Sequence, residues 1–145
     1  MASRLIPPGY GQPNFKPTLA ERETARRNRK SAQQRRPGND DAYLALIRQL
    51  PCCVTLALPP NDPHHLLGGP AGKERAFNRR ATDRWAIPIS RVMHGTVQPL
   101  GARGEVKWFR DHGIADIYEL ADALWHAPRD LEVMANIVRT HRGLK

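Results

Sequence analysis

The stretch "NDPHHLLGG", residues 61–69, places a carboxylate and two adjacent imidazoles between a proline and a glycine pair. Pro63 and Gly68-Gly69 indicate a turn. Neighbouring side chains of a regular strand point to opposite faces, so a distorted turn is expected to aim both His64 and His65 inward. An imidazole that titrates near neutrality is suited to binding a cation or accepting a proton from water. The alternative is a turn in which one histidine is satisfied locally and the other is exposed.

The segments around this stretch predict a small α+β domain. "PCCVTLAL" (51–58) is suited to a strand or a knuckle, and "DRWAIPIS" (83–90) to a second buried strand. "RVMHGTV" (91–97) follows as a short helical turn that carries His94. Helical periodicity marks four further segments, which are 39–50 with Asn39 or Asp40 as its cap, 103–113, 116–125 and 130–142.

The first 37 residues carry most of the positive charge. They hold nine Lys and Arg against two Glu, a net +7 of the +9 of the whole chain. Thr18 and Glu21 form a possible capping box for a helix that has almost no apolar stripe. We therefore expect a basic, largely disordered arm that folds on nucleic acid and contacts phosphates. A merely solubilising tail is the alternative. The expected contact residues are Arg26, Arg27, Arg29, Lys30, Arg35 and Arg36.

A second basic segment, residues 70–82, follows the double histidine and is predicted to be a loop. By themselves its cations fit a solvated loop, and the family resemblance given below implies instead that they contact the DNA backbone; they are Lys73, Arg75, Arg79 and Arg80. The remaining organisation predicted is a domain over 38–128 and a terminal helix over 129–145. That helix is expected to pack internally, with a protein partner as the alternative.

Other features exclude several classes of protein. Nothing approaches 18 consecutive apolar residues, so no membrane span is expected, and residues 1–12 lack the apolar run of a secretory signal. Cys52 and Cys53 are adjacent and cannot staple a fold, which fits a cytoplasmic location. They are expected to act as small buried hydrophobes, because no cation pattern lowers a thiolate pKa there.

The order of these motifs resembles the HNH, or ββα-metal, endonuclease family, and is most similar to small phage and prophage proteins of the recombination-enhancement type. The resemblance runs from about Asp41 to Trp125. It is carried by "LPCCV", "DPHHL", "IPISRVMHG" and "EVKWFRDHGI…ADALW". It implies a ββα-metal core with flanking helices.

The resemblance also implies roles for individual residues. His64 and His94 would bind a divalent cation, and His65 would deprotonate the attacking water. Asp62 and Gln98 are further candidate ligands, and Asp83 would orient the base or support the fold. The implied cation is Mg²⁺, with Mn²⁺ or another transition ion as alternatives, and the implied partner is single- or double-stranded DNA.

Two departures from the family pattern matter. Relatives often hold a structural zinc between a Cys-x-x-Cys and a Cys-x-x-His pair, whereas this chain has Cys53 with Leu56 and Ser90 with Met93 at the corresponding positions. Tetrahedral zinc needs four ligands, so no structural zinc is expected and Leu56 and Met93 should act as packing. The family's second helical histidine is replaced by Gln98, a weak neutral ligand. Two functions therefore stay open: a metal-dependent DNA endonuclease, and an HNH-like DNA-binding or regulatory protein that has lost cleavage.

Overall fold

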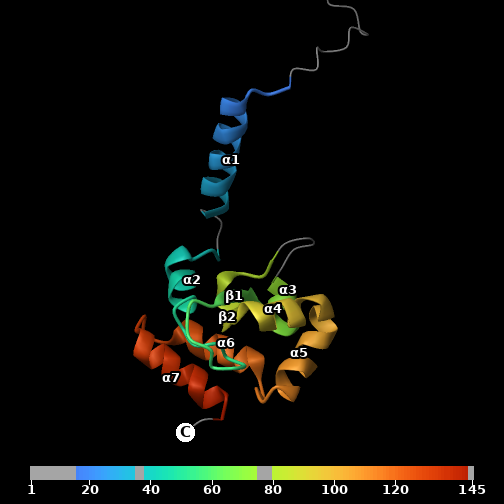
Figure 1. Ribbon diagram of the computed structural model, residues 1–145, viewed down its shortest axis with the longest axis vertical. Helices are drawn as coiled ribbons and strands as arrows, with labels where there is room; N and C mark the ends of the chain where they lie inside the picture. Colours follow the sequence, from blue (N-terminus) through green and yellow to red (C-terminus); the bar gives the residue numbers. More distant parts are fainter. Residues whose placement is uncertain (1–15, 35–37, 75–79, 144–145) are drawn as a thin grey trace, which may run out of the picture. The chain divides into compact units, whose positions relative to one another are not determined.

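The computed structural model of this chain describes residues 16–34, 38–74 and 80–143 (Figure 1). The chain divides into two units, the first ending at Gln33 and the second beginning at Gln34. Each unit is described by itself. The fold class is α+β, as predicted, because helices surround one two-stranded antiparallel sheet in the second unit.

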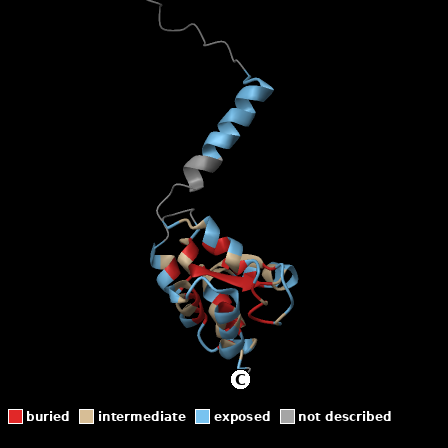
Figure 2. Ribbon diagram, turned by 90° about the vertical axis from the view of Figure 1, so that its left-hand side faces the viewer, coloured by how far each residue is buried: buried red, intermediate tan, exposed pale blue. Residues whose placement is uncertain are grey.

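Helix α1 spans Leu19–Gln34, where the sequence predicts a helix, and the dependence of this helix on nucleic acid stays a prediction. The capping box is present: Thr18 N donates to Glu21 Oε2 at 2.6 Å, and Glu21 N donates to Thr18 Oγ1 at 3.3 Å. Hydrogen bonds from Thr18 N and from the Thr18 hydroxyl lower the pKa of the Glu21 carboxyl. Residues 19–29 are all exposed (Figure 2), so α1 forms through its cap and good helix formers and not through a buried face.

The second unit begins with helix α2, Asp41–Ile47, and Asp40 is its cap. The Asp40 carboxylate accepts from Tyr43 N at 2.9 Å, an interaction that contributes about 1 kcal/mol to helix stability. Tyr43, Leu44 and Ile47 lie on the buried face, as the apolar spacing predicted. This helix therefore anchors the start of the folded unit to the core.

The sheet pairs β1, Asp62–His65, with β2, Ala86–Ile89. The strands are antiparallel, and His64 lies opposite Ile87 while His65 lies opposite Ala86. The prediction of a distorted turn at "DPHH" is wrong, because these four residues continue the ladder of β2. The turn comes later, at the glycine pair.

Short elements connect the strands to the helices that cover them. The basic segment after β1 was predicted to be a loop, but its first part forms helix α3, Gly69–Glu74, in which Lys73 lies; Gly72 N donates to Gly68 O at 3.0 Å. Arg75 and Arg79 lie outside the described residues, as do Arg35 and Arg36. The remaining elements are η1 Asp83–Trp85, α4 Arg91–Val97, η2 Gln98–Leu100, α5 Gly101–Asp111, α6 Ile117–His126 and α7 Leu131–His141.

The core lies between the sheet and the helices (Figure 2). Its largest fully buried side chains come from α2, β2, helices α5 to α7 and the segments that connect them, and include Phe109, Leu120 and Met134. Helix α7 packs on α6 and buries Met134 and Val138. Within the described part of the chain, no helix is both long and apolar enough to span a membrane.

Candidate active site

Three histidines around β1 each contact a different carboxylate. His64 and His65 belong to β1 itself, whereas His94 comes from α4, the helix that follows β2 (Figure 1). We call these histidines and their carboxylates the histidine region. The carboxylates are Glu105 for His64, Asp83 for His65 and Asp62 for His94.

His65 forms the shortest of these pairs. Its Nε2 lies 2.7 Å from Asp83 Oδ1, and the Asp83 side chain is fully buried. The other oxygen of Asp83 accepts from Asp40 N at 2.7 Å, and Arg80 lies 3.6 Å from Oδ1. Burial raises the pKa of the Asp83 carboxyl, but the hydrogen bonds from His65 and Asp40 and the nearby positive charges outweigh it, so the pKa is lowered. A carboxylate can only accept here, so the proton lies on His65 Nε2 and Nδ1 keeps its lone pair.

His64 is 3% exposed, and its side chain contacts Glu105, a fully buried residue of α5. Its Nε2 lies 3.2 Å from Glu105 Oε2. The other oxygen of Glu105 accepts from Leu67 N at 2.6 Å and from Gly68 N at 2.9 Å. Glu105 therefore holds both the imidazole and the backbone that leaves β1.

The glycine pair after β1 makes this close approach possible. A Cβ on Gly68 would lie 3.0 Å from both Ala102 O and Tyr118 Oη, and Gly69 has a φ of +54° beside the ring of Tyr118. Only glycine meets both demands without strain. The glycines therefore let the chain turn tightly against α5 and α6, which brings its amides to Glu105.

His94 completes the region from α4. Its Nδ1 lies 3.1 Å from Asp62 Oδ2, which also contacts Arg91 Nε at 3.1 Å. The rings of His64 and His94 are 5.1 Å apart between centroids and stand at 80° to each other. Because Asp62 occupies Nδ1, the lone pair of His94 lies on Nε2.

The separation of the His64 and His94 rings is compatible with two imidazole ligands of one divalent cation. Imidazoles that share one ion, each with its nitrogen about 2 Å away, have ring centres on the order of 5 Å apart, close to the His64–His94 separation. Carboxylates on the far ring nitrogens are the usual support for such ligands. Over residues 16–34, 38–74 and 80–143, no three His, Cys, Asp or Glu side chains gather at a spacing that could hold a metal ion.

The other two predicted ligands, Gln98 and Asp62, have different surroundings. Gln98 is exposed at the end of α4, where its backbone N–H donates to His94 O. Asp62 supports His94 and Arg91, and its role as a direct ligand stays a prediction. Of the predicted phosphate contacts, Arg26, Arg27 and Arg29 are exposed on α1, and Lys73 and Arg80 are exposed in the second unit. Lys30 lies within α1.

A second region lies where the resemblance expects a structural zinc. Cys52, not Cys53, faces the second half of this motif: its Sγ accepts from Ser90 N at 3.2 Å and from Thr55 N at 3.5 Å. The turn from Cys52 to Thr55 therefore contacts Ser90, the N-cap of α4. We call Cys52, Thr55, Ser90 and Met93 the knuckle region.

The two cysteines have different environments. Burial raises the pKa of the Cys52 thiol, but hydrogen bonds from Thr55, Ser90 and Val54 outweigh it and lower that pKa. Both cysteines are buried, as predicted, but the absence of neighbouring cations gave no sign of the backbone donors that lower the pKa of the Cys52 thiol. Cys53 is fully buried, and burial raises its pKa well above the ordinary value.

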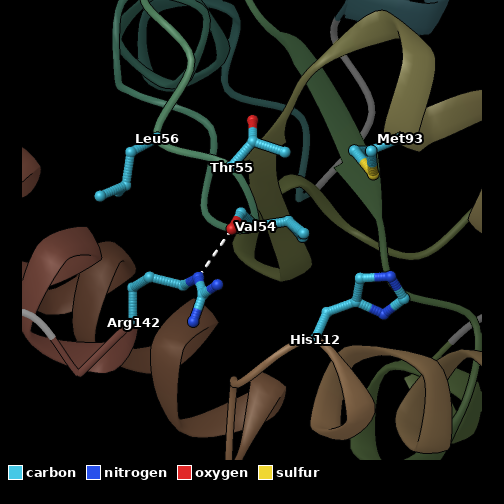
Figure 3. A pocket seen from close by; sticks show the side chains of 6 residues that line it. All are labelled: Val54, Thr55, Leu56, Met93, His112 and Arg142. Carbon is cyan, nitrogen blue, oxygen red and sulfur yellow. Dashed lines mark hydrogen bonds between the residues drawn. The ribbon is translucent and has the colours of Figure 1, made fainter.

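A pocket of about 360 Å³ opens beside the knuckle region (Figure 3). Leu56 and Met93 lie on opposite sides of it, and both pack against the core. Arg142 crosses to the knuckle turn, where its Nε donates to Val54 O at 2.6 Å. Leu56 and Met93 thus act as packing, as expected.

Sequence reasoning missed Glu105 altogether. The amphipathic pattern of its helix marks it only as a polar residue, although its place four residues before the buried Phe109 puts both on one face. That spacing is the signal that could have identified it. Comparison with known proteins adds no relative: no family model, no curated protein and no solved structure matches this chain.

Proposed function

We propose that this protein is a metal-dependent DNA endonuclease of HNH type that hydrolyses phosphodiester bonds around a ββα-metal core. The observation that carries the proposal is the His65–Asp83 pair, at 2.7 Å, next in sequence to a histidine whose ring lies 5.1 Å from that of His94. A general base and a pair of nitrogen ligands then occupy neighbouring positions. The resemblance to HNH proteins assigns the same roles to the same residues.

His65 acts as the general base through Nδ1. Asp83 holds the proton on Nε2, so the lone pair of Nδ1 is available to take a proton from water. Asp83 also stabilises the imidazolium that forms, because its buried charge lies 2.7 Å from the ring. Arg80, 3.6 Å from Asp83, supplies positive charge beside the base, where a phosphate would approach.

His64 and His94 would hold the cation, with the lone pairs of His64 Nδ1 and His94 Nε2 as its ligands. When bound, a divalent cation supplies charge stabilisation to the phosphate and to the leaving oxygen. Mg²⁺ commonly keeps several waters and takes few protein ligands beside substrate phosphates, whereas imidazole ligands favour transition ions. Neighbouring strand residues face opposite ways, which suits an in-line reaction with the attacking and leaving oxygens on opposite sides of the phosphorus.

DNA is held without sequence readout by the basic residues of α1. Arg22, Arg26 and Arg29 follow a helical spacing that places them along one exposed face. Deletion of residues 1–37 should therefore weaken DNA binding and reduce the salt dependence by about 0.9 in log–log slope for each phosphate that the arm neutralises. Fluorescence anisotropy over a salt series measures both quantities. An unchanged slope would show that the arm is not the binding element.

The direct test is cleavage of supercoiled and single-stranded circular DNA with Mg²⁺, Mn²⁺ and Ni²⁺ supplied separately. We expect metal-dependent nicking that falls by about 10²- to 10⁴-fold in His65→Ala, the usual contribution of a general base. His126→Ala is the matched control, because His126 is exposed at the end of α6. Cleavage that survives in His65→Ala would remove the base assignment.

The second candidate is a DNA-binding or regulatory protein with this fold and no cleavage. The observation that favours it is Gln98, which stands exposed one turn after His94 where relatives carry a histidine. An absence of nicking with every ion, together with salt-sensitive DNA binding, would select this function.

A further inference from the structure

Glu105 is the most deeply buried charged group in the histidine region that the proposed mechanism leaves without a role. It lies on α5, 41 residues from His64, and has no exposed surface. A buried carboxylate is costly to desolvate unless hydrogen bonds compensate it. Glu105 receives three: from His64 Nε2, Leu67 N and Gly68 N.

The two carboxylate oxygens of Glu105 have different hydrogen-bond partners. Oε1 accepts both backbone amides, at 2.6 and 2.9 Å, whereas Oε2 contacts only the imidazole. The backbone contacts hold the turn after β1, so a structural role would be complete with Oε1 alone. The contact of Oε2 at 3.2 Å does something further, because it decides which nitrogen of His64 carries the proton.

We propose that Glu105 is a positioning residue that fixes His64 in the Nε2–H tautomer and so leaves the lone pair on Nδ1. The use of that lone pair for a cation rests on the proposed function; the tautomer assignment does not. In the other tautomer Nδ1 would carry a proton and could not bind a cation. Asp62 does the same for His94 with the opposite nitrogen, because it contacts Nδ1.

Glu105→Gln separates the two roles. The amide oxygen can still accept from Leu67 N and Gly68 N, while the amide nitrogen takes the place of Oε2 and can only donate. His64 Nε2 must then accept, which moves the proton to Nδ1. Glu119→Gln on the exposed surface of α6 is the matched control, since it makes the same chemical change away from the site.

The first readout is the ¹⁵N chemical shifts of the His64 imidazole in the metal-free protein, measured by long-range ¹H–¹⁵N correlation. We expect Nε2–H in the wild type and in Glu119→Gln, and Nδ1–H in Glu105→Gln, with the Leu67 and Gly68 amides still protected from hydrogen exchange. A wild-type protein with Nδ1–H would overturn the proposal. The proposal would also be overturned if Glu105→Gln left the tautomer of His64 unchanged.

The second readout is calorimetric titration of the same proteins with Mn²⁺ and Ni²⁺. Removal of such a supporting partner typically weakens metal affinity 10- to 100-fold, and we expect that weakening in Glu105→Gln alone. If the wild type binds neither ion, the cation role in the proposed function fails, while the tautomer result still decides the role of Glu105. If the wild type binds and Glu105→Gln binds equally well, Glu105 does not position His64 for a ligand.

Discussion

Helix α4 carries two neighbouring residues that belong to different regions. His94 contacts Asp62 in the histidine region, whereas Met93 lines the pocket beside the knuckle region. In the histidine region every imidazole keeps a carboxylate partner. In the knuckle region a thiol accepts backbone amides, and a thioether and a leucine fill the space.

The two regions are held by different kinds of contact. The turn at Cys52 is held by Leu56 N, which donates to Cys52 O at 2.8 Å, and by the two amides that donate to Cys52 Sγ. These hydrogen bonds and the surrounding apolar side chains stabilise the turn through direct contacts. In the histidine region the imidazoles depend on buried charges, which would cost free energy without their partners.

Among the variants that test this difference between the two regions, Asp83→Asn is expected to have the largest effect. The amide can still accept from Asp40 N, but its nitrogen would donate to His65 Nε2 and move the proton to Nδ1. Under the proposed function we expect cleavage to fall by about 10²- to 10⁴-fold, measured as nicking of supercoiled DNA. Asp111→Asn, at an exposed position on α5, is the control. Full activity in Asp83→Asn would show that the tautomer of His65 is irrelevant.

Replacement of Cys52 and of Cys53 by serine should lower the free energy of unfolding by different amounts. Cys53→Ser buries a polar group in the core and should cost about 1–3 kcal/mol of unfolding free energy. Cys52→Ser should cost less, because the serine oxygen can accept from Ser90 N and Thr55 N. Urea unfolding of both variants checks this order. Equal losses would mean that the amide bonds to Cys52 contribute little.

The pH dependence of the free energy of unfolding tests the contribution of ionised Asp83 to stability. Its folded-state pKa is lowered, so its ionised form stabilises the protein above the ordinary aspartate pKa, and that contribution is lost as pH falls through the lowered value. The free energy of unfolding of the wild type should therefore exceed that of Asp83→Asn near neutral pH, well above the ordinary aspartate pKa of about 3.9. Below about pH 4 the difference should narrow. Urea unfolding at each pH measures it, and a gap that widens in acid would contradict the sign.

The smallest effect is expected from Gln98→His. An imidazole at this position adds a ligand one turn after His94 and should tighten Ni²⁺ binding by on the order of tenfold, which is about 1.4 kcal/mol. Calorimetric titration beside the wild type measures the change. No change in affinity would place the cation away from this end of α4.

Local signals accounted for much of the fold. Apolar spacing located α2, α5, α6 and α7, and Asp40 was one of the two predicted caps of α2, because capping depends on residues three positions apart. The "DPHH" stretch was misjudged because its strand is stabilised by pairing with β2, which lies more than 20 residues away in the chain. The start of the basic loop was misjudged as well, since α3 forms where the chain turns against Tyr118.

By itself the sequence determined the α+β class, the charge of the arm and the histidines that could carry chemistry. Each of these follows from composition or from residues close together in the chain. Only the tertiary structure decided that His64 meets Glu105, that His65 meets an Asp83 already bonded to Asp40, and that Cys52 faces Ser90. Those partners are 18 to 43 residues apart. Which atoms meet across such separations depends on how the helices pack, and a linear pattern contains no distance between them.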